Sequence, residues 1–419
     1  MGFSEKQREI MRFPYRKYDA LICDGAVRSG KTSIMSLSFF LWAMGNFNNC
    51  AFAFCGKSVG AVERNIVMPL LSVTYLKDNF TICYNRGDHV IIAKRGKREN
   101  RIYLFGGKDE SSYMLIQGVT LAGVLLDEVA LMPRSFVEQA LARCSVSGAK
   151  FWFNCNPENP LHWFRQEWIL KAPERKALHL HFRMEDNPSL SEETRRRYQN
   201  MYSGVFYQRY ILGLWVMSEG LIYDMFDQTE NRYRDGEAPV DLRWTGRRYI
   251  ACDYGTTNPC VFLEIFDYQE RTVYIDREYR WDSRSEDARR SGNPQKTDSQ
   301  YADDMEDFMG TDPESQCMVV VDPSAASFIA ELRSRGVYVK PANNEVVDGI
   351  RVVGSLLGRR GIRINGDNCK GLIGEMRSYV WDDKAAERGE EKPVKQKDHG
   401  PDALRYYCYT VLPKWRIGA

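Results

Sequence analysis

The chain lacks the cysteine spacing of a zinc site or of a disulfide framework. Its 11 cysteines are scattered singly, and no C-x-x-C pair occurs anywhere in the sequence. This arrangement is typical of free thiols in a reducing compartment. The sequence also has no signal-peptide pattern and no apolar run that approaches ~18 residues. We therefore expect a cytoplasmic protein that is not inserted in a membrane.

The chain also lacks an excess of positive or negative charge. The 58 Lys and Arg residues nearly balance 56 Asp and Glu residues, which leaves a formal net charge of +2. Any surface for nucleic acid must therefore be a local patch. The basic segment "KRGKREN" is one candidate, although it is equally typical of a solvated hairpin tip. With 419 residues, of which 43% are hydrophobic, the chain has enough apolar material for two or three domains.

Residues 1–181 alternate short apolar runs with helical patterns, as in "ALICDGAVRSGKTSIMSLSFFLWAM". Such alternation predicts a mostly parallel sheet with helices on both faces. Residues 182–240 have helical spacing and read as a small helical linker or lid subdomain. Residues 241–419 begin with three extended runs, which predict an antiparallel meander, and continue as a second α/β domain.

The segment "GAVRSGKT" matches the phosphate-binding pattern G-x-x-x-x-G-K-T between a predicted strand and a predicted helix. In this pattern the backbone N–H groups of a glycine-rich loop surround the phosphates of ATP. Lys31 is expected to reach the β- and γ-phosphates, and the Thr32 hydroxyl is expected to help hold Mg²⁺. The predicted ATP-binding residues of the loop are Gly25, Arg28, Ser29, Gly30, Lys31 and Thr32.

The segment "GVLLDE" predicts the acidic partner of this loop. Asp127 ends an apolar strand, where it would hold Mg²⁺, and Glu128 follows as the candidate base that activates water. Arg28 could stabilise negative charge in the transition state. Arg64 or Arg143 could act as an arginine finger across a subunit boundary, although surface arginines without a catalytic role remain an open alternative.

A second group of acidic residues lies in the C-terminal half. Asp253 ends the predicted strand "YIACD", Asp322 ends "MVVVD", and Asp402 begins a predicted helix. Three converging carboxylates could bind two Mg²⁺ or Mn²⁺ ions and cleave a phosphodiester. His399 precedes Asp402 by three residues and is a candidate helper at this site. Asp398 is expected to be only solvated.

With these motifs in place, the chain resembles the large terminase subunit of tailed bacteriophages over essentially its whole length. The resemblance rests on "GAVRSGKT", "GVLLDE", "FWFNCNPENP", "CDYGTTNP", "VVVDPSA" and "DHGPDALRY" in that order. It implies an α/β fold with an ASCE-type P-loop ATPase domain, a small helical linker subdomain and a ribonuclease H-like nuclease domain. It also places Gln7 at an adenine-contacting position and Asn156 in the motif that couples hydrolysis to movement.

The implied activity is ATP-driven translocation of double-stranded DNA through the portal protein into a procapsid, together with cleavage of concatemeric DNA. The implied cofactors are ATP and Mg²⁺, with Mn²⁺ as an alternative at the nuclease site. The implied partners are a small terminase subunit and further copies of the chain, in a homo-oligomer (a pentamer) on the portal that can be monomeric in solution. The expected location is the cytoplasm of the infected bacterium and not the mature virion.

The main alternative is a P-loop helicase–nuclease of DNA repair or phage defence. Such an enzyme requires a second RecA-like domain with further helicase motifs, and the sequence contains none of them. The second α/β pattern starts too soon after residue 240 to leave room for that domain.

Overall fold

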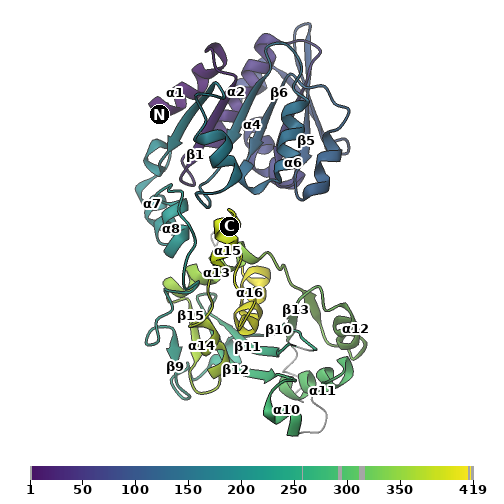
Figure 1. Cartoon of the computed structure of the whole chain (residues 1–419), viewed down its shortest axis with the longest axis vertical. Helices are drawn as coiled ribbons and strands as arrows, with labels where there is room; N and C mark the ends of the chain where they lie inside the picture. Colours follow the sequence, from purple (N-terminus) through teal and green to yellow (C-terminus); the bar gives the residue numbers. More distant parts are fainter. Residues whose placement is uncertain (1, 257, 291–294, 311–316, 414–415, 417–419) are drawn as a thin grey trace. The chain divides into compact units, whose positions relative to one another are not determined.

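The computed structural model describes residues 2–256, 258–290, 295–310, 317–413 and 416 (Figure 1). The chain forms two compact units. The first unit contains residues 1–196, 207–217 and 387–390, and the second contains residues 197–206, 218–386 and 391–419. Residues 182–240 are divided between the units and contain α7 (Glu192–Gln199), α8 (Gly204–Tyr210) and a short strand, β9 (Arg232–Tyr233).

The first unit is built on an eight-stranded sheet with the order β3-β4-β5-β2-β6-β7-β1-β8. The strands from β5 to β8 along this order pair in parallel, and the β3–β4 and β4–β5 pairs are antiparallel. The sheet therefore confirms the mostly parallel prediction and the hairpin over the basic segment. Its strands are β1 (Ala20–Gly25), β2 (Ala51–Gly56), β3 (Thr81–Asn85), β4 (Val90–Arg95), β5 (Arg98–Gly106), β6 (Gly123–Asp127), β7 (Lys150–Asn154) and β8 (Ala177–Phe182).

Both faces of this sheet are buried, because neighbouring residues of each central strand enter different cores. Leu21 and Cys23 of β1 belong to the core with α1 (Glu5–Arg12) and α2 (Lys31–Asn46), whereas Ala20 and Ile22 belong to the core with α6 (Arg134–Ala142). Strands that are buried on both faces read as continuous apolar runs, as the sequence predicted. The remaining helical segments of this unit are η1 (Phe13–Tyr15), α3 (Val59–Val62), η2 (Glu63–Val67), α4 (Met68–Ser72), α5 (Thr74–Asn79), η3 (Glu110–Ile116), η4 (Val129–Leu131), η5 (Arg165–Ile169) and η6 (Met184–Asp186).

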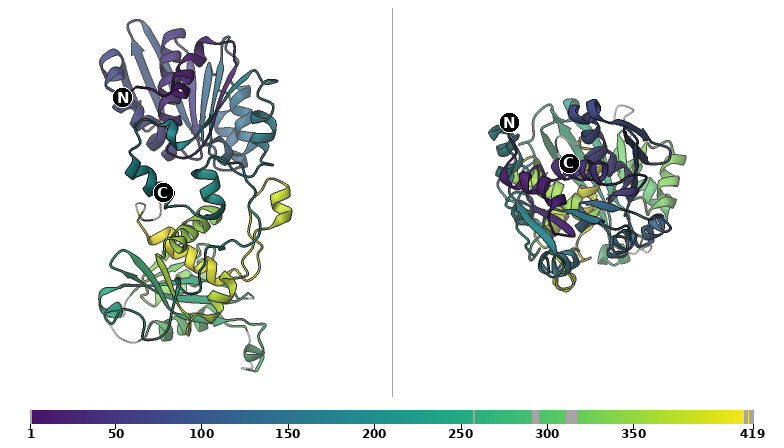
Figure 2. Two further views of the ribbon diagram at one scale, coloured as in Figure 1. Left: turned by 90° about the vertical axis from the view of Figure 1, so that its left-hand side faces the viewer. Right: turned by 90° about the horizontal axis from the view of Figure 1, so that it is seen from above.

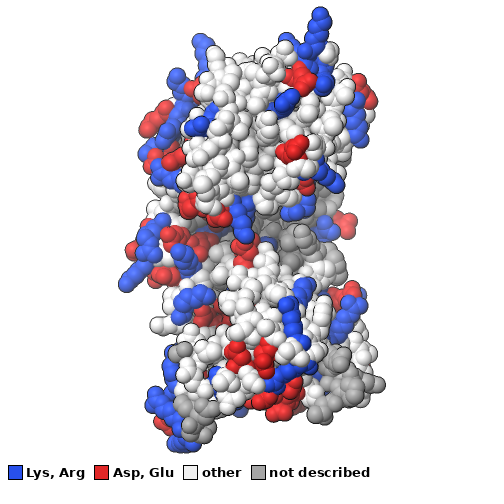
Figure 3. All heavy atoms as spheres, turned by 90° about the vertical axis from the view of Figure 1, so that its right-hand side faces the viewer, with Lys and Arg blue, Asp and Glu red and all other residues white. Residues whose placement is uncertain are grey.

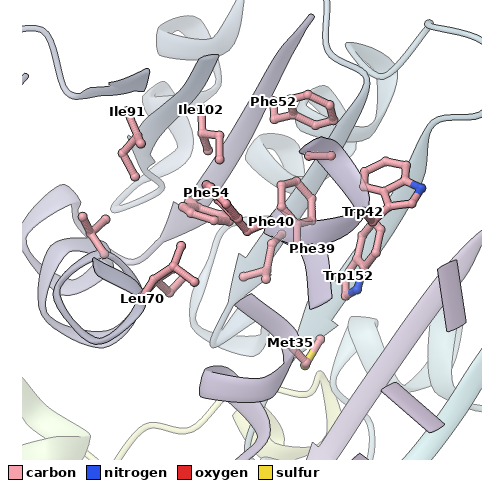
Figure 4. Packing of buried hydrophobic residues seen from close by; sticks show 14 of the residues in the cluster. Met35, Phe39, Phe40, Trp42, Phe52, Phe54, Leu70, Ile91, Ile102 and Trp152 are labelled. Atoms are coloured by element: carbon pink, nitrogen blue, oxygen red, sulfur yellow. The ribbon is translucent and has the colours of Figure 1, made fainter. Parts of the chain in front are cut away.

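Aromatic rings dominate the core beneath α2 (Figure 4). The Trp152 ring on β7 lies 4.9 Å from the ring of Phe13, 4.8 Å from Phe39 and 4.7 Å from Trp42, measured between centroids. Tilted and edge-to-face pairs of this kind add to the free energy that burial alone contributes. These contacts fix α2, and therefore the loop before it, against the sheet.

The second unit contains a seven-stranded mixed sheet with the order β14-β13-β10-β11-β12-β15-β9. The antiparallel meander predicted from the sequence is confirmed as β10 (Arg247–Asp253), β11 (Cys260–Tyr268) and β12 (Thr272–Trp281). On either side of the meander the pairs are parallel. The other strands are β13 (Met318–Val321), β14 (Val339–Pro341) and β15 (Ile362–Asn365).

Helices cover both faces of this second sheet (Figure 2). Ile250 and Val319 pack with α11 (Asp298–Met309) and α12 (Ala326–Ser334). On the other face, α16 (His399–Val411) packs against β10, where the ring of Tyr407 lies 5.1 Å from that of Tyr249. The other helices of the second unit are α9 (Leu242–Thr245), α10 (Glu286–Arg290), α13 (Val346–Gly358), α14 (Lys370–Met376) and α15 (Asp383–Glu387). The last residue of α15 belongs to the first unit.

Charged side chains of both signs are interspersed over the face shown in Figure 3, where Lys and Arg lie next to Asp and Glu in several places. This mixture agrees with the nearly balanced composition of the sequence. Among the described residues, no helix is long and apolar enough to cross a membrane.

We predict that Trp152→Ala lowers the free energy of unfolding of the first unit by about 3–5 kcal/mol, because it leaves a cavity between three aromatic rings. Urea denaturation followed by circular dichroism measures this change. Trp244→Ala is the control, since this side chain is 84% exposed and its loss should change stability by less than about 0.5 kcal/mol. Equal stability losses in the two variants would contradict the packing described above.

Candidate functional site

The first site lies where β1 runs into α2. Gly25 ends β1 with a φ of 122°, and a Cβ at this position would lie 2.0 Å from the carbonyl oxygen of Phe182. Gly30 caps α2 with a φ of 82°. Both positions therefore require glycine, which explains the two fixed glycines of the "GAVRSGKT" motif. The strand, loop and helix that the sequence predicts around this motif are confirmed.

Lys31 is buried at the start of α2, and its ammonium group donates to backbone oxygens of the loop. The distances are 3.0 Å to Gly25 O and 2.7 Å to Ala26 O, and Asn156 Oδ1 accepts from the same group at 3.3 Å. Burial lowers the pKa of Lys31, although the negative field of Asp24 and Asp127 partly opposes this effect.

Parallel pairing brings the ends of β6 and β7 to the same edge as this loop, where Asp127 is in register with Asn154. Thr32 Oγ1 donates to Asp127 Oδ1 at 3.1 Å, and Asn154 Nδ2 donates to Thr32 Oγ1 at 2.8 Å and also to Asp127 Oδ1. Asn65 Nδ2 donates to Asp127 Oδ2 at 3.3 Å. Burial raises the pKa of Asp127. The three hydrogen bonds that its carboxylate accepts, from Asn154, Asn65 and Thr32, oppose the increase.

Asn154 was not singled out from the sequence, although it ends a buried strand just as Asp127 does. Its Oδ1 atom is buried and has no hydrogen-bond partner among the described residues. A buried acceptor beside Thr32 and Asp127 is suited to a water molecule on a bound Mg²⁺ ion. The residues present therefore fit the predicted Mg²⁺–nucleotide complex.

The other residues predicted for this site also lie around the loop. Gln7 is buried, and its Nε2 atom would be 2.9 Å from a Cβ on Gly30. Ser29 is buried and donates to Ala26 O at 2.8 Å. Arg28 is exposed and has a left-handed backbone, with a φ of 57°. Glu128 directly follows Asp127 and is also left-handed, with a φ of 58°.

The two arginines predicted as alternative trans-acting residues lie elsewhere in the first unit. Arg64 is exposed on η2, a single π-helical turn that also carries Asn65. Arg143 is half-buried at the C-terminal end of α6. Their assignment as arginine fingers therefore stays a prediction.

The second site lies at the N-terminal end of α16, in the second unit. His399 Nδ1 is 2.8 Å from Asp253 Oδ2 at the end of β10. Asp402 lies one turn further along α16, and its Oδ1 accepts from Arg405 Nε at 3.1 Å. Asp322 follows β13, and its Oδ2 accepts from the Tyr406 hydroxyl at 2.5 Å. Thr257 of the "CDYGTTNP" motif lies outside the described residues.

The acidic groups around His399 influence one another's pKa values. Burial raises the pKa of Asp253, and the charges of Asp402 and Asp398 raise it further against the hydrogen bond from His399. Burial lowers the pKa of His399, but the hydrogen bond to Asp253 and the surrounding carboxylates raise it above its ordinary value. Burial and the fields of Asp253 and Asp402 raise the pKa of Tyr406.

The expectation that Asp398 is merely solvated is wrong, because only 6% of this residue is exposed. It is the N-cap residue of α16, and its backbone oxygen accepts from Asp402 N at 2.7 Å. Its carboxylate pairs with Lys395 Nζ at 3.5 Å, and the same ammonium lies 3.4 Å from Asp402 Oδ2. The shared Lys395 ammonium ties this carboxylate to the site, which the motif alone did not reveal.

The donor set of the second site fits a divalent cation in its chemistry, because crowded carboxylate oxygens favour Mg²⁺ or Mn²⁺. The side-chain positions are less favourable. Among the described residues, no group of three or more His, Cys, Asp or Glu side chains is arranged to hold a metal ion. Asp253, Asp322 and Asp402 each form a hydrogen bond with a protein partner, which is His399, Tyr406 and Arg405 respectively.

A buried ion-pair network that the sequence did not reveal holds the start of α16. Glu375 Oε2 accepts from Gly400 N at 2.7 Å and from Arg280 Nη2 at 2.9 Å. Glu375 Oε1 accepts from Arg280 Nη1 at 2.7 Å, and Arg280 Nε donates to Glu278 at 2.9 Å. A carboxylate at the N-terminus of a helix is favoured by the helix dipole and by the unpaired N–H groups there.

Fold and sites together define a P-loop nucleotide-binding unit joined in one chain to a second α/β unit with an acidic site. Residues 22–229 match the family described as terminase large subunit, T4likevirus-type, N-terminal. The large terminase of a thermophilic bacteriophage is 48% identical, with a TM-score of 0.90, and the match covers 98% of this chain and 100% of that one. The chain therefore belongs to the phage large terminase family.

Two further structures of the same thermophilic phage enzyme give similar matches. Its complex with ADP is 48% identical with a TM-score of 0.88, and its complex with ATP-γ-S is 47% identical with a TM-score of 0.87. Each match covers 98% of this chain and 100% of that chain. The comparison with curated proteins found no significant match. Large terminases are DNA-packaging proteins of phages, and this chain is one of them.

We predict that Glu375→Ala loosens the first turn of α16, because it removes the acceptor of Gly400 N and leaves half-buried Arg280 with one partner fewer. Amide hydrogen exchange around Gly400 should become roughly 10- to 150-fold faster, as expected for loss of a charge-assisted hydrogen bond worth ~1.5–3 kcal/mol. Glu375→Gln keeps an acceptor oxygen and should show a smaller increase.

The control is Glu331→Ala on α12, which removes a carboxylate that pairs with Arg335 at 2.9 Å. Its exchange rates in α16 should equal those of the unaltered protein. Unchanged exchange in Glu375→Ala would contradict a role for this residue in holding the helix.

Proposed function

We propose that this chain hydrolyses ATP at the loop between β1 and α2, and that the energy drives double-stranded DNA through the portal into the procapsid. The observation that carries the proposal is the cluster of Thr32, Asp127 and Asn154 beside buried Lys31, at the shared edge of three parallel strands. The thermophilic phage large terminase, which is 47–48% identical, has been solved with ADP and with ATP-γ-S. That likeness supports ATP as the nucleotide.

In this proposal the loop residues bind and orient the triphosphate. The N–H groups of Ser29, Gly30 and Lys31 lie at the N-terminus of α2, where a helix end favours anions. The Lys31 ammonium would exchange its loop carbonyl acceptors for phosphate oxygens. Mg²⁺, held by Thr32 and Asp127, would neutralise negative charge on the phosphates.

Glu128 is the proposed base that orients and deprotonates the attacking water. It directly follows Asp127 with a strained left-handed backbone, and such strain is a feature of functional sites. Arg28 is proposed to stabilise charge on the transferred phosphoryl group. Arg64, which is exposed on η2, is the better placed candidate for an arginine finger toward another subunit, since Arg143 is half-buried.

Two further residues are proposed to respond to the bound nucleotide. Gln7, which is buried beside Gly30, would contact the adenine base. Asn156 would sense the phosphates through Lys31, from whose ammonium group it accepts at 3.3 Å.

The second unit is proposed to be the nuclease, with a ribonuclease H-like fold. Its central meander extended by parallel strands supports this assignment. Asp253, Asp322 and Asp402 would hold Mg²⁺ or Mn²⁺ after turning from their present partners, and the cations would activate water and stabilise the leaving oxygen. His399 would orient the water or Asp253. The first unit is correspondingly proposed to have an ASCE-type fold.

The proposed domains are an ATPase motor in residues 1–181, a helical linker in residues 182–240 and a nuclease in residues 241–419. DNA and the packaging machinery are the partners expected of a large terminase. More specifically, we propose the portal protein, a small terminase subunit and a homo-oligomeric ring, with action in the cytoplasm of the infected bacterium. The helicase–nuclease alternative is not favoured by the family assignment.

Lys31→Ala should lower the ATPase rate by at least about 100-fold, because it removes the charge that faces the phosphates. Cleavage of plasmid DNA in Mn²⁺ should stay within about twofold of the unaltered protein. A phosphate-release assay and gel electrophoresis measure the two activities. Lys77→Ala, at an exposed position of α5, is the control and should keep both. An active Lys31→Ala ATPase would refute the assignment of the nucleotide site.

Asp322→Ala should have the opposite effect, lowering DNA cleavage by at least about 100-fold while ATP hydrolysis stays within about twofold. The physical reason is the loss of one of three proposed metal ligands. Asp307→Ala, exposed on α11, removes a carboxylate from the same unit and should cut DNA normally. If Asp322→Ala cuts DNA as fast as this control, the metal-site assignment is wrong.

A further inference from the structure

Residues 207–217, which we call the strap, lie against the first half of the phosphate-binding loop. Val27 N donates to Tyr210 O at 2.8 Å. Gly213 has a φ of 74°, and a Cβ at this position would lie 3.1 Å from Ala26 N. Trp215 Nε1 donates to Asp24 Oδ2 at 2.7 Å. The strap therefore reaches the residue before the loop and two residues within it.

Asp24, which accepts the hydrogen bond from Trp215 of the strap, is buried. Only 1% of Asp24 is exposed, and its other oxygen, Oδ1, lies 2.8 Å from His179 Nε2 and 3.1 Å from His181 Nδ1 on β8. Burial alone would raise the pKa of Asp24, but the hydrogen bonds from the two histidines and from Trp215 lower it below its ordinary value. An ionised carboxylate in the core needs all of these partners, since an unpaired buried charge is costly.

The strap itself is firmly held in the first unit. Arg209 is fully buried, donates from Nε to Val216 O at 3.0 Å, and pairs through Nη1 with Glu158 at 3.3 Å. Glu158 lies in the "FNCNPENP" segment that also contains Asn156. The strap is thus fastened to the segment after β7 as well as to the loop after β1.

We infer that Trp215 and Asp24 are positioning residues for ATP binding, which they influence through the backbone of the loop. The Val27 N–H, which the strap holds, belongs to the same peptide unit as the Ala26 carbonyl oxygen to which Lys31 donates, and Gly213 of the strap lies close to Ala26 N. A shift of the strap therefore changes both the orientation of loop N–H groups and the acceptors of Lys31. This inference rests on the proposed ATPase function of the same loop.

The course of the chain gives the strap a second consequence. The residues on both of its sides, 197–206 and 218–386, belong to the second unit. The strap, which is hydrogen-bonded to the phosphate-binding loop, is therefore covalently continuous with the second unit at both of its ends.

The test compares nucleotide affinity and ATPase kinetics of the unaltered full chain and its Trp215→Phe variant. The variant keeps an aromatic ring but removes the N–H donor to Asp24. We expect the Kd for a fluorescent ADP analogue and the KM for ATP to rise about tenfold, with kcat changed less than threefold. Trp163→Phe, a half-buried tryptophan of the same unit, should leave both constants unchanged.

A double-mutant cycle separates positioning from a general structural effect. If Trp215 acts through Asp24, then Asp24→Asn combined with Trp215→Phe should raise the Kd no further than the larger single effect. Independent structural damage would instead multiply the two factors. Multiplied factors would overturn the inference.

Gly213→Ala provides a second route should Trp215→Phe fail to fold. The added methyl group presses on Ala26 N and should raise the Kd for the ADP analogue. Gly220→Ala is its matched control, because Gly220 has a similar φ of 71° and open space around it. Unaltered affinity in Gly213→Ala and in any folded Trp215→Phe would overturn the inference. Failure of the unaltered chain to hydrolyse ATP would instead overturn the proposed function, while the Kd comparison would still test the strap.

Discussion

The parallel register of β1, β6 and β7 is the constraint on which the nucleotide site depends. Strands that run in the same direction end at the same edge, so Asp127 and Asn154 are brought level with the loop that leaves β1. A slip of one residue would turn each of these side chains to the opposite face of the sheet. The aromatic packing around Trp152 holds β7 and α2 together, and thereby keeps Asn154 and Thr32 in hydrogen-bond contact.

The second site depends instead on how the N-terminal end of α16 is held. Asp402 and His399 both come from the first turn of α16, whereas Asp253 ends β10 and Asp322 follows β13. The strand ends are fixed by sheet pairing, so the geometry of the site depends on where the helix begins. Glu375 determines that position by accepting from Gly400 N while Arg280 neutralises its charge. A buried carboxylate is tolerable there because every oxygen has a donor.

The sequence predicted those features that local patterns encode. Glycine spacing predicted the loop, and apolar runs predicted the strands. The same runs predicted that Asp127, Asp253 and Asp322 lie at strand ends. Asn154 was within reach of the same reasoning, because it also ends a buried strand. The network around Asp24 was not, since its partners Trp215 and His179 lie 191 and 155 positions further along the chain. The burial of Asp398 was missed because a hydrophilic segment near a helix start gives no sign of what covers it.

The negative charges of Asp127 and Asp402 are balanced by different kinds of neighbouring groups. Asp127 is stabilised mainly by neutral donors, Thr32, Asn154 and Asn65, which leaves its negative charge available to a cation. Asp402 has a buried arginine and a lysine beside it, so part of its charge is already balanced by the protein. A cation entering the first site meets a carboxylate whose hydrogen-bond donors are neutral, whereas one entering the second must replace existing ion pairs. A cation at the second site would have to displace the buried pair between Arg405 and Asp402, which costs free energy, so the first site is the better suited of the two to a cation.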